Sequence, residues 1–314
     1  MTSTLRTALT DYLSLRRSMG FTLVRAGQLL SSYVAWLDQN GIDVITVDNA
    51  MAWVRSSPVT VAGSPGLSGR MNAVRGFADY LHAIDPVHEQ IPPGLVSCHR
   101  QRAVPYLYSD NDIAAIMANA RHIKTPFRRA TIATLIGLLA VTGMRIGEVL
   151  ALDDTDFDPA EALLTVRHAK LGKQRLLPLH PSTVTSVHRY RRRRDREFPH
   201  PVSSALLVSG AGTPLSVNRV EKTFAKLVDT AGLRSRSNRR RPRPHDLRHT
   251  FAVHTLLDWY RDGGDIDARM PLLSTYLGHV APANTYWYLT GAPELLAEAA
   301  RRLDTYATER GERS

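Results

Sequence analysis

The chain has 314 residues, which is long enough for two domains with separate hydrophobic cores. Lys and Arg number 40 against 29 Asp and Glu, so the formal net charge is +11, and 43% of the residues are hydrophobic. This composition excludes a disordered chain. The positive excess favours a polyanionic partner, most often nucleic acid, over a merely soluble basic surface.

A single cysteine, Cys98, excludes an internal disulfide and any zinc site built from several cysteines. Polar residues interrupt the apolar positions between 5 and 15, so we expect no signal peptide. The longest apolar run, 130–144, is too short to cross a bilayer and predicts a buried helix. Together these features predict a cytoplasmic protein that has no membrane partner.

Residues 1–88 predict an all-helical first domain, because their apolar side chains recur at helical spacing. We expect four helices here: one that ends near Gly20, one that ends at Gly41, and two more over about 47–55 and 67–83.

A linker between two domains is predicted at 89–105, where prolines and glycines break regular structure. Just before it, Arg70 and Arg75 lie on the fourth predicted helix. Arginines on a helix face are usually solvated, but in a basic chain they are also candidates for contacts with a DNA backbone.

The remainder, 106–314, predicts a second domain of helices with a small β-sheet. Helices are expected from Ser109 to Met117, over 126–141 and, after a break at Gly143, over 144–150.

Arg145 falls in the first turn of the helix predicted over 144–150. Free backbone N–H groups at a helix start and the planar guanidinium both suit a phosphate. An ion pair with Glu148, three residues further on, is the alternative. The residues alone leave these two interpretations open.

Alternating side chains at 163–166 and 176–179 predict a β-hairpin, with Lys170 and Lys173 in its turn. A flexible ammonium group there could reach a bound ligand, although exposed turn lysines are normally just solvated.

Two arginine-rich stretches, 189–196 and 234–243, flank an amphipathic helix that ends at Gly232. Such runs are usually solvated or disordered, but two of them in a basic chain favour contact with a phosphate backbone. The candidates for DNA contacts in this domain are Lys173, Arg191, Arg192, Arg239, Arg240, Arg241 and Arg243.

The stretch 245–260 predicts a helix, and its His245 and Arg248 share a face because they are three residues apart. His249 and His254 are expected elsewhere round this helix, at the surface or in the core. Another helix, predicted over 269–277, precedes His279.

Phosphoryl transfer without a metal needs fixed cations, a nucleophile and an acid for the leaving oxygen. The second domain offers arginines, lysines, histidines and a terminal tyrosine for these tasks. We find no P-loop, no Gly-rich dinucleotide motif and no carboxylate cluster typical of a two-metal site.

Three motifs carry a resemblance to a known family: TGMRIGEVLAL around Arg145, HDLRHTFA around His245 and Arg248, and LGH followed by a tyrosine nine residues after its histidine. In this order they resemble the tyrosine recombinase (phage integrase) family over most of 106–290. The ending NTYWYLTGAPELL is similar to members carried by transposons.

The resemblance implies a mainly α fold with a small β-sheet. An all-helical, SAM-like core-binding domain that contacts DNA would occupy 1–88. An α+β catalytic domain with a C-terminal helical tail would occupy 106–314.

The resemblance also implies roles for individual residues. Arg145 and Arg248 would clamp the phosphate, Lys170 rather than Lys173 would protonate the leaving oxygen, and His245 and His279 would be the two active-site histidines.

Two tyrosines compete for the role of nucleophile. Tyr286 and Tyr288 would point about 200° apart on a helix, so only one of them can face the site. The family spacing from His279 selects Tyr288. Tyr286 and Tyr276 are then expected to be packing residues.

The implied activity is site-specific DNA recombination through a 3′-phosphotyrosine intermediate, with no metal, ATP or other cofactor. The implied partners are double-stranded DNA with a specific core site, three further copies of the chain in a tetramer on two DNA sites, and accessory recombination proteins. A type IB topoisomerase and a non-catalytic DNA-binding regulator are the alternatives.

Overall fold

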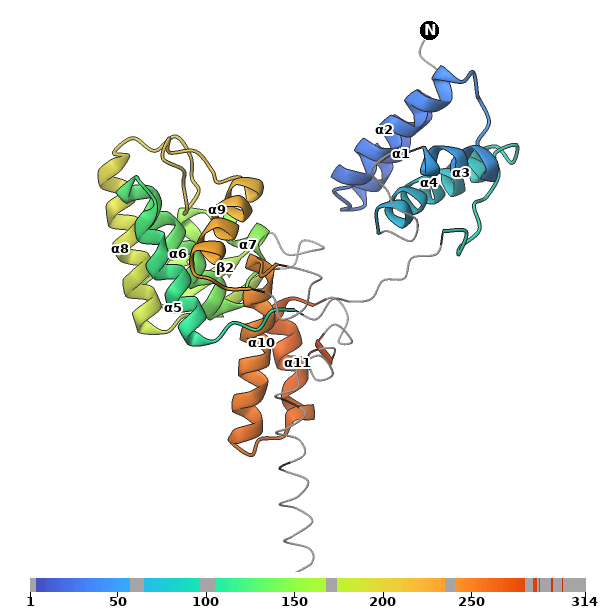
Figure 1. The fold of residues 1–314 in the computed structure, drawn as a ribbon. Helices are drawn as coiled ribbons and strands as arrows, with labels where there is room; N and C mark the ends of the chain where they lie inside the picture. Colours follow the sequence, from blue (N-terminus) through green and yellow to red (C-terminus); the bar gives the residue numbers. More distant parts are fainter. Residues whose placement is uncertain are drawn as a thin grey trace, which may run out of the picture. The chain divides into compact units, whose positions relative to one another are not determined.

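The computed structural model describes residues 4–56, 65–96, 105–167, 174–234 and 241–279, and beyond them the single residues 285, 286, 288, 295 and 301. The chain divides into two compact units, 1–102 and 103–314 (Figure 1). This division lies inside the segment that the sequence predicts as a linker. In the parts that the structure describes, no helix is long and apolar enough to cross a membrane.

The first unit contains the four predicted helices: α1 (Thr4–Ser18), α2 (Val24–Gln39), α3 (Val47–Arg55) and α4 (Pro65–Ile84). The start of α3 is defined by Thr46, whose hydroxyl accepts a hydrogen bond from the backbone N–H of Asn49. The core of the first unit is formed by side chains that are almost fully buried, among them Leu30, Tyr33, Leu37, Trp53 and Phe77.

The second unit is mainly helical. Its helices are α5 (Asp110–Asn119), the 3₁₀ turn η1 (Ala120–His122), α6 (Pro126–Thr142), α7 (Ile146–Leu150), the 3₁₀ turn η2 (Asp154–Asp156), α8 (Pro181–Glu197), α9 (Val217–Thr230), α10 (Pro244–Arg261) and α11 (Ile266–Leu277). The first arginine-rich stretch is therefore helical, because it lies within α8. Val187 and Tyr190 attach this helix to the core.

A small antiparallel sheet has the strand order β1 (Phe157–Asp158), β2 (Leu163–Val166), β3 (Arg175–Pro178). The predicted hairpin corresponds to β2 and β3, in which Thr165 pairs with Leu176. The two-residue β1 is not predicted by the sequence. Because β3 begins at Arg175, that side chain lies at the end of the sheet next to the predicted lysine turn.

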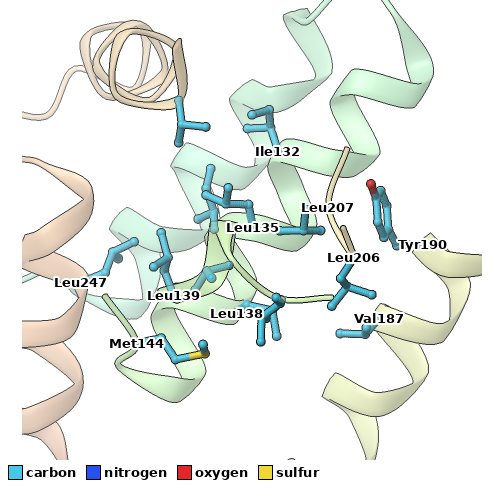
Figure 2. Close-up of a cluster of buried hydrophobic side chains, with 14 of the residues drawn as sticks. Ile132, Leu135, Leu138, Leu139, Met144, Val187, Tyr190, Leu206, Leu207 and Leu247 are labelled. Carbon is cyan, nitrogen blue, oxygen red and sulfur yellow. The ribbon is translucent and has the colours of Figure 1, made fainter. Parts of the chain in front are cut away.

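The core of the second unit is built around α6, with α5 and α8 packed along it (Figure 1). Figure 2 shows side chains from α6 meeting residues of α8, α10 and the connecting segments: Leu135, Leu138, Leu139, Met144, Val187, Leu206, Leu207 and Leu247.

The helix α6 ends at Gly143, whose φ is +60°. A Cβ at Gly143 would lie 2.5 Å from a ring carbon of Phe251, so both the backbone angle and the space favour glycine.

A second apolar cluster in this unit joins α10 to α11 through residues such as Val253, Leu256, Leu273 and Leu277. Two residues from beyond 279, Tyr288 and Leu295, are buried in the same cluster. The tyrosine singled out by the sequence is therefore packed against the helices that carry His245, Arg248 and the turn before His279.

Candidate active site

Arg145 is the residue just before α7, at its N-cap position, rather than in its first turn. Its Nη1 donates to Oε1 of Glu148 over 2.7 Å, and its Nη2 donates to the carbonyl oxygen of Gly278 over 3.0 Å. The ion pair that the sequence left open is thus present. About a third of the arginine side chain stays exposed (35%), so this pair does not close the guanidinium off from a ligand.

Glu148 also binds a second arginine, Arg175, which the sequence reasoning did not single out. Nη2 of Arg175 donates to Oε2 over 2.7 Å, and its Nη1 donates to Oε1 over 3.2 Å. Burial by itself would raise the pKa of Glu148, but hydrogen bonds from Arg175 and from Arg145 outweigh it and lower that pKa to about 2. The sequence does carry a signal for Arg175, because it is a charged residue at the first position of a short apolar strand.

Arg248 lies on α10 and is only 2% exposed. Its Nη1 donates to the carbonyl of Gly143 over 2.8 Å and its Nη2 to the carbonyl of Leu277 over 2.7 Å. One guanidinium thereby joins the ends of α6 and α11. Desolvation, and next the charge of Arg145, lower the pKa of Arg248 to about 10, so it remains a cation at neutral pH.

His279 follows Gly278, which ends α11 with a φ of +66°. Its backbone N–H donates to the carbonyl of Ser274, and its Nδ1 lies 2.7 Å from the hydroxyl oxygen of Thr285. Desolvation, followed by the charges of Arg248 and Arg145, lowers the pKa of His279 to about 4. The ring is therefore neutral at pH 7.

His245 lies in the first turn of α10, and part of its side chain is exposed. Packing within the site desolvates the rest of the ring, and the positive charges of Arg248, Arg243 and Arg145 act in the same direction. Together these effects lower the pKa of His245 to about 4. A neutral imidazole can accept a proton, as a general base must.

Tyr288 is 3% exposed and lies in the same cluster. Its ring stacks beside His279, with centroids 6.0 Å apart, and makes an edge contact with His249 at 5.4 Å. Tyr286, by contrast, is 43% exposed, so the expectation that it is a packing residue is wrong. Tyr276 does pack, because it stacks on Phe251 at 5.5 Å.

The expectation that His249 lies away from the site is also wrong. Its ring contacts His245 edge-to-face, with centroids 4.9 Å apart, as well as Tyr288. The signal was in the sequence, because residues four apart on a helix share a face.

The proposed contacts with DNA fall into three groups. Lys170, Lys173, Arg239 and Arg240 lie outside the described residues. Arg192 is exposed on α8, and Arg241 is largely exposed, with Asp229 at 3.6 Å. Several others have partners within their own unit, and for all of them the contact with DNA stays a prediction.

The arginines with such partners are held by short contacts. Arg70 lies over the ring of Trp53 at 3.6 Å, and Arg75 donates to the carbonyls of Ile91 and Pro92. In the second unit, Arg191 is paired with Asp154 and Arg243 with Asp246. Across the described ranges, no group of three or more His, Cys, Asp or Glu residues is arranged to hold a metal ion.

Residues 107–294 match the model of the phage integrase family. Two putative integrase/recombinases of Sinorhizobium fredii are similar over almost their whole length. One, y4rB, is 42% identical over 96% of this chain and 98% of its own; the other, y4rE, is 35% identical over 93% of each.

Solved structures share the fold. The Tn1549 transposon integrase in complex with transposon right end DNA has a TM-score of 0.63 at 17% identity, covering 96% of this chain and 99% of that one. The XerH site-specific recombinase bound to palindromic difH substrate also has a TM-score of 0.63, at 19% identity, covering 87% of this chain and 77% of that one. The fold class predicted from the motifs is confirmed. This chain belongs to the phage integrase family of tyrosine recombinases.

Proposed function

We propose that this protein is a site-specific DNA recombinase that cuts and rejoins DNA strands through a covalent bond to Tyr288. The observation that carries the proposal is the convergence of Arg145, Arg248, His279 and Tyr288 at one site. The relatives support the activity, because they are named integrases, recombinases and Xer tyrosine recombinases. Nothing among them favours a type IB topoisomerase or a non-catalytic regulator.

In the proposed cleavage step, the Tyr288 hydroxyl oxygen attacks the scissile phosphorus. The bond to the 5′ oxygen breaks, leaving a 3′-phosphotyrosine and a free 5′-hydroxyl. His245 accepts the phenol proton, and Lys170, assigned by the family resemblance, protonates the leaving oxygen. A 5′-hydroxyl from another strand then reverses these steps on the phosphotyrosine.

The charge that develops on the phosphate is stabilised by the two arginines, Arg145 and Arg248, while His279 donates a hydrogen bond to a non-bridging oxygen. The phosphotyrosine retains the energy of the phosphodiester, so rejoining requires no ATP. We propose no cofactor or metal for this reaction.

The DNA partner is a duplex with a specific core site. We propose that the helical unit, predicted at 1–88, is the core-binding domain and that 106–314 is the catalytic domain. A lambda integrase tetramer bound to a Holliday junction has the same fold, which supports a tetramer of this chain on two DNA sites. Accessory recombination proteins are further proposed partners. We place the reaction in the cytoplasm, where bacterial DNA lies.

The test is to trap the covalent intermediate. The protein is incubated with fragments of its source genome, the DNA that stays attached after denaturation is sequenced, and a nicked suicide duplex is built on the cleaved site. We expect wild type and Tyr286→Phe to form the adduct and Tyr288→Phe to form none. An adduct with Tyr288→Phe would show that another residue is the nucleophile.

A further inference from the structure

Glu148 lies between two guanidinium groups. Arg145 and Arg175 each reach one of its oxygens at 2.7 Å, and Arg175 binds both oxygens. The glutamate side chain is 6% exposed and that of Arg175 is 10% exposed. One buried carboxylate is therefore shared by two cations, of which Arg175 is largely shielded from water and Arg145 is partly exposed.

Because Glu148 binds both arginines, Arg175 determines the net charge around Arg145, the side chain proposed to bind the phosphate. Arg145 and Glu148 alone would form a neutral pair, and in a site of low dielectric the carboxylate would cancel much of the arginine's attraction for an anion. Arg175 adds a second cation, so the group of three carries one net positive charge. When Arg248 is included, the net positive charge of these side chains is two. A phosphodiester carries one negative charge, and attack by a phenolate adds a second.

Arg175 is also fixed in place. It opens β3, and a Cβ at Gly278 would lie 2.8 Å from its Nη1, so the glycine allows the guanidinium to approach this closely. The carbonyl of Gly278 accepts the other hydrogen bond of Arg145. Arg175 thus packs against the turn whose carbonyl accepts a hydrogen bond from Arg145.

We propose that Arg175 is a positioning residue for DNA cleavage, which neutralises Glu148 and so leaves the charge of Arg145 available to the scissile phosphate. This proposal rests on the proposed recombinase function. Arg175 itself does not need to touch the DNA.

The first experiment compares two linkages at the cleaved position: the natural phosphodiester and an uncharged methylphosphonate. Arg175→Gln should slow cleavage of the phosphodiester by about 10- to 100-fold, which is less than the roughly 100- to 1000-fold lost with a donor that touches the developing charge, because Arg175 acts through Glu148. It should slow cleavage of the methylphosphonate clearly less, because that linkage is uncharged before attack and only the one charge added by the phenolate has to be stabilised. Equal slowing on both linkages would overturn the proposal and leave Arg175 a structural role only.

A matched control is Arg167→Gln. Arg167 lies just beyond β2 of the same sheet, but its ion pair is with Asp156 and not with Glu148. We expect it to cleave both linkages like wild type. A loss equal to that of Arg175→Gln would point to the sheet, or to overall charge, and would also overturn the proposal.

The second experiment removes the carboxylate as well. If Arg175 acts by neutralising Glu148, the double variant Glu148→Gln/Arg175→Gln should cleave the phosphodiester faster than the single variant Arg175→Gln. Thermal melting is used to show that both variants fold. A double variant slower than Arg175→Gln contradicts the proposal. Tyr288→Phe is measured in parallel, since an adduct there would show that another residue is the nucleophile without affecting the Arg175 comparison.

Discussion

The Nδ1 of His279 lies 2.7 Å from the hydroxyl oxygen of Thr285, which is completely buried. A hydrogen bond at one ring nitrogen sets the orientation of the imidazole and leaves the other nitrogen for a ligand. This contact joins His279, two residues beyond the end of α11, to Thr285, which is three residues before Tyr288.

We therefore predict that Thr285→Val slows formation of the covalent adduct by about five- to tenfold, the equivalent of one neutral hydrogen bond. Thr285→Ser keeps the hydroxyl and should remain close to wild type. The rates would be measured on the nicked suicide duplex. If the valine and serine variants cleave equally, the hydroxyl has no part in orienting His279.

Arg248→Lys should reduce both activity and stability. A lysine ammonium group cannot reproduce the planar pair of bonds to the carbonyls of Gly143 and Leu277 while it also faces a phosphate. We expect a loss of about 2–4 kcal/mol in the free energy of unfolding, because buried carbonyls lose charged donors. Urea unfolding followed by circular dichroism measures this. A variant as stable as wild type would mean that the two bonds do not support the fold.

Gly143→Ala should destabilise the catalytic unit more than Gly232→Ala. Both glycines have positive φ, +60° and +70°, so both substitutions carry the backbone cost of about 1–2 kcal/mol for an L-residue in the left-handed region. Only at Gly143 would the new Cβ also meet Phe251, whereas nothing lies within 4 Å at Gly232. The comparison of melting temperatures separates the two effects. Equal losses would show that the ring of Phe251 moves aside freely.

The stability of the catalytic unit should fall as the pH is lowered from about 6.5 towards 4. Histidines in the unfolded chain take up protons near pH 6.5, whereas the pKa values of His245 and His279 in the folded protein are about 4. The unfolded state therefore binds more protons across this window, and the free energy of unfolding decreases as pH falls. The stabilisation by these neutral rings is fully present above pH 6.5.

The check is urea unfolding at several pH values for wild type and His245→Gln/His279→Gln. The double variant should lose less stability over the same window, because two of the groups that cause the decline are absent. Parallel declines would indicate that other groups, such as the carboxyl of Glu148 below its unfolded pKa, account for the effect.

The sequence predicts which segments form the site, because its motifs have fixed spacing on helices and the family resemblance supplies their order. It does not predict the partnership of Arg175 with Glu148. These residues are 27 positions apart, and no local period connects a strand to a helix start. His249 is four residues after His245, so helical spacing alone places the two rings on one face of α10.

The high density of arginines also made one helix difficult to predict from the sequence. The arginine-rich stretch 189–196 is typical of a solvated or disordered segment, yet it lies in α8 because Val187 and Tyr190 are buried. Arg194 is buried too, and donates to the carbonyls of Ala205 and Leu206. A two-residue strand such as β1 is too short for alternation to be detected.

The contacts of Arg248 have a consequence for biosynthesis. The carbonyls that hold its guanidinium come from residues 105 positions earlier and 29 positions later in the chain. Contacts of such long sequence separation form late in folding, since the intervening chain must first be ordered. A growing polypeptide released or stalled before Leu277 has made α6 and α10 but has no second carbonyl for this arginine. Such a chain also lacks Tyr288, so the second carbonyl partner of Arg248 and the proposed nucleophile are both supplied by the last part of the chain to be synthesised.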